Sequence, residues 1–195
     1  EFSIYQTDTF QTHFSIYGIS LDNDDPGIAY NSIGVNGAST ASYLRCKMFT
    51  QHLKAIHPDL VIFCLGINDA YDPDFCENCY EQNYDTLVAK IRSVNPNAEF
   101  LFVTNNDSYY KRKYPNKRVL PAREAMINLA NKYNAGMWDM FNVMGGLGSV
   151  KTWQDNEMAK KDKIHLTNKG YRLIGDLMFS AIIKEYAKHL QNIEE

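Results

Sequence analysis

Two short, unbroken apolar runs constrain the fold more than any other feature of this sequence. "LVIFCL" occupies residues 60–65 and "AEFLFVT" occupies residues 98–104. Runs of this length are typical of strands that are covered on both faces. Helical patterns alternate with them at 40–57, 77–94, 120–134 and 167–190, and "AGMWDMF" (135–141) indicates a last short strand. This alternation predicts a mainly parallel sheet with helices on both faces.

The first part of the chain has a different pattern. Residues 2–19 are rich in Phe, Tyr, Thr and Ile with an alternation that predicts β-structure, and "GIAYNSIGV" (27–35) predicts a second strand. Between them, "LDNDDP" (21–26) has the composition of a turn and suits an antiparallel hairpin. We therefore expect a β-rich segment at 1–26, the tail of an inserted or upstream region, followed by an α/β domain at 27–195.

Composition narrows the classes of function. With 195 residues, 45% hydrophobic and 22% charged, the chain suits one globular domain. A formal net charge of −3 gives no reason to expect nucleic acid as a partner, and no apolar stretch approaches the roughly 20 residues that span a bilayer. Cys76 and Cys79 form one CxxC, and zinc would need two further ligands. A local disulfide or two ordinary thiols is favoured over a redox site there.

Three stretches carry residues suited to chemistry, because ligands of parallel sheets bind beyond the carboxyl ends of the strands. In "GVNGAST" (34–40), Gly37 offers an unobstructed backbone N–H for an oxyanion; the plainer interpretation is a tight turn. In "LGINDA" (65–70), Asn68 offers an amide donor and Asp69 a brace for the loop, although both are common turn residues.

The third stretch is "DKIHLTNKGY" (162–171), just before the final helix. Asp162 and His165 are three residues apart, so one loop supplies a general base and the carboxylate that orients it. Taken alone, this pattern also fits an exposed loop with a capping role.

Together, the order and spacing of these three blocks resemble those of the SGNH hydrolases, also called the GDSL esterase family. The resemblance covers residues 27–190 and implies a flavodoxin-like three-layer α/β/α fold and ester hydrolysis through an acyl-enzyme. By position, Gly37 and Asn68 resemble the family's oxyanion donors, His165 its base, and Asp162 the acid that orients the base. No metal or organic cofactor is implied.

The chain departs from the family at the nucleophile, because it has no G-D-S turn. "GISL" (18–21) differs from the family's G-D-S-L by one letter, but only six residues separate Ser20 from Gly27. A crossover to the next parallel strand needs about a dozen residues or more. We therefore expect the nucleophile upstream of residue 1, and little turnover by this chain alone.

The favoured function is a serine esterase acting on a small acyl ester, with an acetylated carbohydrate as the family-level expectation. The alternatives are an inert SGNH-like module that binds carbohydrate or a protein partner, and a non-hydrolytic flavodoxin-like domain. The loop at 105–118 adds two tyrosines for stacking on a sugar and several basic residues for an acidic substrate, or is simply a solvated basic loop. A periplasmic or extracellular location is expected only because it is common in that family. The sequence leaves the oligomeric state open.

Overall fold

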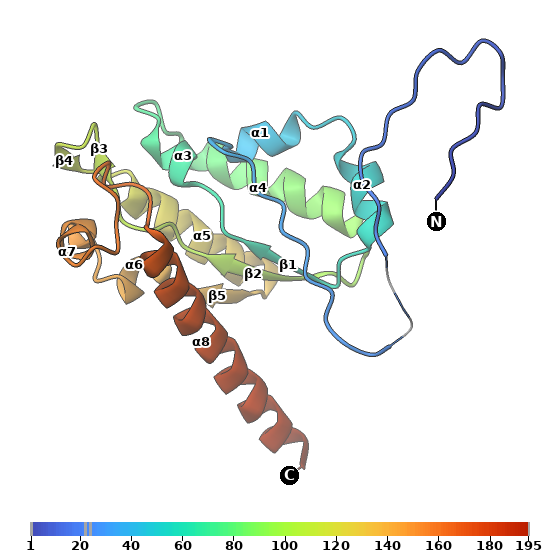
Figure 1. Cartoon of the computed structure of the whole chain (residues 1–195). Helices are drawn as coiled ribbons and strands as arrows, with labels where there is room; N and C mark the ends of the chain where they lie inside the picture. Colours follow the sequence, from blue (N-terminus) through green and yellow to red (C-terminus); the bar gives the residue numbers. More distant parts are fainter. Residues whose placement is uncertain (1, 22, 24, 195) are drawn as a thin grey trace. The chain divides into compact units, whose positions relative to one another are not determined.

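The computed structural model describes residues 2–21, 23 and 25–194, and the chain divides into one unit at 1–33 and another at 34–195 (Figure 1). The strands expected at 2–19 and 27–35 do not form, since the described residues there contain neither helix nor strand. Apolar side chains in both stretches are exposed, for example Phe10 and Ile28. An alternating strand is stable only when other strands pair with it and its apolar face is covered. Of the turn expected at 21–26, residues 22 and 24 lie outside the described part.

The second unit is built on a parallel sheet of three strands. They are β1 (Leu60–Phe63), β2 (Glu99–Val103) and β5 (Gly136–Trp138), in the order β1-β2-β5. Leu60 pairs with Glu99 and Leu101 pairs with Gly136, so the carboxyl ends of all three strands lie at one edge. These are the strands that the apolar runs predict, each somewhat shorter than expected. A separate antiparallel hairpin joins β3 (Tyr109–Tyr110) to β4 (Tyr114–Pro115).

Helices follow the predicted alternation. They are α1 (Thr40–Leu44), α2 (Phe49–Ile56), α3 (Ile67–Tyr71), α4 (Glu77–Arg92), α5 (Val119–Tyr133), α6 (Met140–Val143), α7 (Ser149–Asp155) and α8 (Asn168–Glu194). The single helix expected at 40–57 is two helices, because the chain turns at 45–48, where the Cys46 N–H donates to the Tyr43 carbonyl. No helix in the described part of the chain is long and apolar enough to cross a membrane.

Two hydrophobic clusters lie on opposite faces of the sheet. Successive residues of β2 alternate between them, Phe100 and Phe102 in the cluster with α4 and α5, and Leu101 and Val103 in the cluster with α6, α7 and α8. Figure 1 shows the sheet between these two groups of helices. This is the three-layer α/β/α arrangement expected from the sequence, and it fixes the carboxyl edge of the sheet as a platform for loops.

Two surfaces of this unit are unusually exposed for their composition. Among the described residues, β1 pairs with no strand other than β2. The later turns of α8 carry an apolar stripe at helical spacing that is also exposed, made of Phe179, Ile183, Tyr186 and Leu190. Unpaired strand edges and exposed apolar helix faces are normally covered by further structure.

Candidate active site

Asp162 and His165 form a compact turn just before α8. One carboxylate oxygen of Asp162 accepts the backbone N–H groups of Ile164 and His165, each at 2.9 Å. The other oxygen lies 3.0 Å from Nδ1 of His165. An ionised carboxylate only accepts hydrogen bonds, so this contact assigns the proton of the neutral ring to Nδ1 and leaves Nε2 as the basic nitrogen. The imidazole is 54% exposed, and its Nε2 has no hydrogen bond to any described residue.

The electrostatics of Asp162 suit an orienting carboxylate. Burial raises its pKa, but the hydrogen bonds from the His165 and Ile164 N–H groups and from the imidazole outweigh burial, so the pKa lies below the ordinary 3.8. Asp162 is therefore ionised throughout the neutral range. A fixed negative charge beside Nδ1 stabilises the imidazolium that forms when Nε2 takes a proton.

Gly37 and Asn68 come together at the second part of the site. The Ala38 N–H donates to the Val35 carbonyl and closes a tight turn in which Gly37 has a φ of +72°, a conformation that favours glycine. The Asn68 amide nitrogen donates to the Ala38 carbonyl at 2.8 Å. An amide carries two N–H groups, so this contact orients the side chain and leaves the second donor for a ligand.

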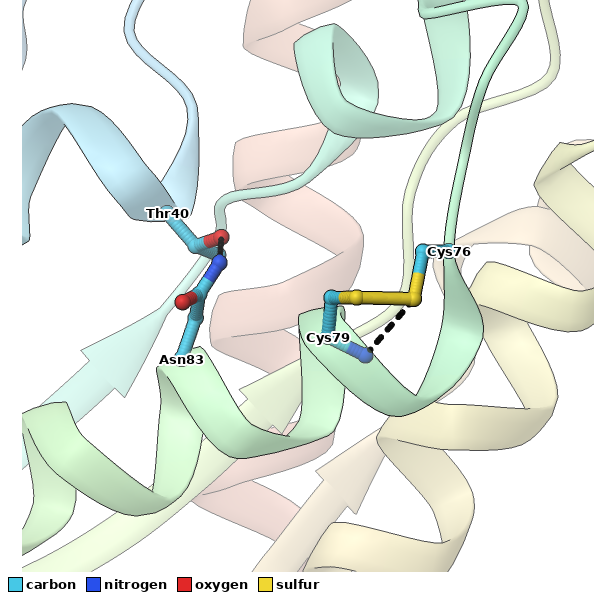
Figure 2. Close-up of a disulfide and its surroundings, with 4 residues drawn as sticks. All are labelled: Thr40, Cys76, Cys79 and Asn83. Carbon is cyan, nitrogen blue, oxygen red and sulfur yellow. Dashed lines mark hydrogen bonds between the residues drawn. A yellow bond between two sulfur atoms is a disulfide. The ribbon is translucent and has the colours of Figure 1, made fainter.

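A partly buried polar network holds these two loops together. Both carboxylate oxygens of Asp69 accept the Thr40 N–H at 3.1 Å, and one of them accepts the Thr40 hydroxyl at 2.6 Å. Asn83 of α4 donates its amide to the same hydroxyl oxygen at 2.9 Å, as Figure 2 shows. Burial raises the pKa of Asp69, and the hydrogen bonds from Thr40 oppose that rise. The brace expected of Asp69 is confirmed.

Two tyrosines of α4 fix the chain as it leaves β1. The hydroxyl groups of Tyr80 and Tyr84 both donate to the Leu65 carbonyl, at 3.0 and 2.6 Å. Burial raises the pKa of both phenols well above its ordinary value, so both keep the proton that they donate. Next to that carbonyl, Gly66 has a φ of +130°, and a Cβ there would overlap the Tyr80 hydroxyl. These contacts therefore fix the backbone conformation of the loop that presents Asn68.

Residues 105–118 connect the two parts of the site. Asn116 donates its amide to the Ala70 carbonyl at 2.9 Å, directly after the Asn68–Asp69 pair. Asn106 donates its amide to the Ile164 carbonyl at 2.9 Å, directly before His165. Both loops are thus tied to the segment that follows β2, at the carboxyl edge of the sheet. Among the described residues, Asn68 and His165 make no hydrogen bond to each other.

The structure places each residue chosen from the sequence. It brings Asp162 to His165 and the Gly37 turn to Asn68, and it ties both pairs to one edge of the sheet. The sequence did not identify Thr40 and Asn83 as supports. A threonine at the start of a helix and an asparagine within one are too common to single out, and only their contacts in the folded chain distinguish them.

Cys76 and Cys79 form a disulfide at the start of α4, which is one of the two states that the sequence left open (Figure 2). The Cys76 sulfur also accepts the Cys79 N–H at 3.2 Å, so the bridge caps the helix that carries Tyr80, Asn83 and Tyr84. The structure thus links an accessible disulfide to the helix that positions the Asn68 loop.

Removing this bridge is expected to destabilise the domain modestly. A loop this short restricts the unfolded chain by about 2 kcal/mol, which corresponds to a fall in Tm of about 4–8 °C. The measurement is thermal unfolding of Cys76→Ser/Cys79→Ser and of the parent protein with and without dithiothreitol. Cys46→Ser, at an exposed free thiol, is the matched control and should leave Tm unchanged. An unchanged Tm in reduced parent protein would contradict a stabilising role for the bridge.

Comparisons with known proteins bear on the family and the fold of this chain. The family model described as "GDSL-like Lipase/Acylhydrolase family" matches residues 13–173, a range that includes Ser20 as well as all three blocks. A search of curated proteins gave no match.

Among solved structures, a peptidoglycan O-acetylesterase is similar with a TM-score of 0.73 and 24% identity, over 78% of this chain and 45% of that one. This chain therefore spans less than half the length of that protein. A lipase/acylhydrolase from Enterococcus faecalis has a TM-score of 0.58 and 22% identity, over 75% and 71% of the two chains. The acetyl xylan esterase AlAXEase has a TM-score of 0.59 and 19% identity, over 77% and 79%. At these identities the likeness shows the fold.

The family model spans the greater part of the chain, and the structural neighbours share its α/β fold. The chain belongs to the GDSL-like lipase/acylhydrolase family, the SGNH hydrolases.

Proposed function

We propose that this chain forms the greater part of a serine esterase that removes a small acyl group from a carbohydrate, with the attacking serine supplied from outside residues 1–195. The observation that carries this proposal is the Asp162–His165 pair, whose Nε2 is free among the described residues, at the same sheet edge as Gly37 and Asn68. The names of two similar structures, a peptidoglycan O-acetylesterase and an acetyl xylan esterase, favour acetyl as the acyl group.

The reaction follows from the roles that these atoms can take. His165 Nε2 takes the proton of the serine hydroxyl as the serine oxygen bonds to the ester carbon. The Gly37 N–H and the free Asn68 N–H bind the oxyanion that forms. When the tetrahedral intermediate collapses, the bond to the leaving alcohol breaks and His165 protonates that alcohol. Water then repeats the sequence on the acyl-serine, which releases the acid and restores the serine.

One feature of the sequence and two of the structure support an external serine. The sequence lacks a G-D-S turn. Among the described residues, β1 has a strand partner on one side alone, and α8 carries an exposed apolar stripe. A further strand along β1 would complete the sheet and extend its carboxyl edge, where a serine would meet His165. The topological argument against Ser20 rests on the sequence alone, because the expected hairpin around it does not form.

The test is hydrolysis of p-nitrophenyl acetate by residues 1–195 and by the same protein extended at its N-terminus, each with and without Ser20→Ala. The extended protein is expected to be active and the shorter chain to show no detectable turnover, because triad members act as a unit. Activity in the shorter chain that Ser20→Ala abolishes would make Ser20 the nucleophile and overturn an external serine. An inactive extended protein would instead favour the inert binding module.

A further inference from the structure

The hairpin formed by β3 and β4 is strongly basic in an acidic chain. Residues 108–118 contain five basic residues and no acidic one, whereas the whole chain has a net charge of −3. Lys111, Arg112, Lys113 and Lys117 are exposed, and none forms an ion pair with another described residue. We call these four residues the hairpin cluster.

The hairpin lies between the two parts of the active site. On one side, the Lys111 N–H donates to the Tyr71 hydroxyl at 3.0 Å, at the end of the helix that carries Asn68. On the other side, the Tyr109 N–H donates to the Lys163 carbonyl at 2.9 Å, two residues before His165. The Lys163 ammonium also reaches the Arg112 carbonyl at 3.3 Å, which adds a fifth cation to the same surface.

The backbone of the hairpin turn is unfavourable for the residues that it contains. The Lys113 N–H donates to the Tyr110 carbonyl, and the two residues between them, Lys111 and Arg112, have φ values of +51° and +63°. Hairpin turns with two left-handed residues strongly favour Asn-Gly, because a Cβ in this conformation comes too close to the following carbonyl oxygen, a cost that glycine avoids and that asparagine offsets with local hydrogen bonds. The two cations are therefore kept at a cost in stability, which is expected of residues that serve a ligand.

The two tyrosines of β3 are already in contact with cations of the chain. The Arg118 guanidinium lies 4.4 Å from the centre of the Tyr110 ring, and the Lys163 ammonium lies 4.5 Å from the centre of the Tyr109 ring. A sugar that stacked on these rings would compete with those contacts. The hairpin therefore presents mainly positive charge to a ligand, because cations of the chain already contact both aromatic rings.

From this geometry we propose that the hairpin cluster binds carboxylate groups of the substrate, so that the acyl esters hydrolysed here are carried by an acidic polysaccharide. This inference rests on the proposed esterase function. Exposed guanidinium and ammonium groups attract carboxylates, and Arg112 can pair with one through two parallel hydrogen bonds. Charges beside the reacting bond hold an anionic chain across Asn68 and His165 and raise its local concentration.

The test uses a variant that removes charge and improves the turn at the same time. Lys111→Asn/Arg112→Gly creates the preferred residues for this turn, so Tm should stay equal or rise while affinity for an acidic glycan falls. Binding of polygalacturonate and of neutral xylan fragments of the same length is measured by calorimetry in the N-terminally extended protein. We expect polygalacturonate to bind more tightly by about 10-fold or more, and the variant to lose about 10-fold of that affinity. The loss should shrink as salt is added.

The matched control removes two charges elsewhere. Lys54 on α2 and Lys184 on α8 are exposed and have no ion pair with a described residue, and Lys184 lies on the order of 24 Å along the helix from its start. Lys54→Gln/Lys184→Gln should leave polygalacturonate affinity unchanged. An equal loss in this control, or equally tight binding of single-stranded DNA, would reduce the cluster to a general attraction for polyanions and overturn the proposal.

A kinetic comparison separates this inference from the esterase function. The ratio of kcat/KM for acetylated polygalacturonate to that for p-nitrophenyl acetate should fall about 10-fold in the hairpin variant. An unchanged ratio and an unchanged affinity would refute the hairpin site while the esterase stands. Selective binding of polygalacturonate without turnover of either ester would refute the esterase while the anion site stands.

Discussion

Replacing His165 with alanine in the N-terminally extended protein is expected to lower kcat for p-nitrophenyl acetate by about 10⁴-fold or more. The serine would lose the group that takes its proton and later returns it to the leaving alcohol. The Gly37 N–H and the Asn68 amide would remain, so a small residual rate above that of water should persist. Steady-state kinetics at saturating ester measure this loss.

Asp162→Asn should reproduce much of this loss while leaving His165 in place. An asparagine in the same position can present an N–H to Nδ1, which would move the ring proton to Nε2 and make that nitrogen a donor.

The sign of the stability change for Asp162→Asn follows from the lowered pKa of Asp162. Its hydrogen bonds stabilise the fold above the ordinary carboxyl pKa, and that stability is lost as the pH falls through the lower folded value. The variant should therefore lose stability at neutral pH and little in strong acid.

His189→Ala is the matched control for both variants, because this histidine is exposed near the end of α8. It should retain the parent kcat. If His165→Ala kept more than a tenth of the parent kcat, the Asp162–His165 pair would not be the acid–base machinery, and the site would have to be sought elsewhere on the sheet edge.

The sequence predicts the parts of this site that depend on local pattern. Buried strands at 60–65 and 98–104 place the following loops at one edge, and the short spacing from Asp162 to His165 lets one turn hold both. The supports Thr40 and Asn83 depend on a contact between residues 43 positions apart, which no local pattern shows. The sequence does not predict the hairpin of β3 and β4 for a related reason. Its turn contains Lys and Arg, where Asn and Gly are the usual signal.

In the N-terminal stretches, by contrast, the sequence predicts strands that the structure does not contain. Their alternation is a real β pattern, but a pattern specifies which face is apolar and not whether a partner strand is present. The expected strands at 2–19 and 27–35 therefore have no counterpart in the structure. The stripe of α8 is a similar case in the second unit, because its apolar side chains remain exposed among the described residues.

The other large effect is expected at Gly66, where the chain turns from β1 into the Asn68 loop. Gly66→Ala meets two separate penalties. A φ of +130° strains any residue with a Cβ, and the new Cβ would overlap the Tyr80 hydroxyl and lie 2.7 Å from its ring carbon Cζ. Relief requires Tyr80 to move, which would break its hydrogen bond to the Leu65 carbonyl inside the core. We expect a loss of about 4 kcal/mol in the free energy of unfolding, and a fall in Tm on the order of 10 °C.

Two glycines separate these penalties. Gly148 has a φ of +91° with open space around a Cβ, so Gly148→Ala should show backbone strain alone, about 1 kcal/mol. Gly175 lies inside α8 with nothing near its Cβ, and Gly175→Ala should be neutral or stabilising by up to about 1 kcal/mol. Adding Tyr80→Phe to Gly66→Ala removes the overlapping oxygen and should recover part of the loss. If Gly66→Ala cost no more than Gly148→Ala, the contact with Tyr80 would not fix the loop. The position of Asn68 would then depend chiefly on the Asp69–Thr40 brace.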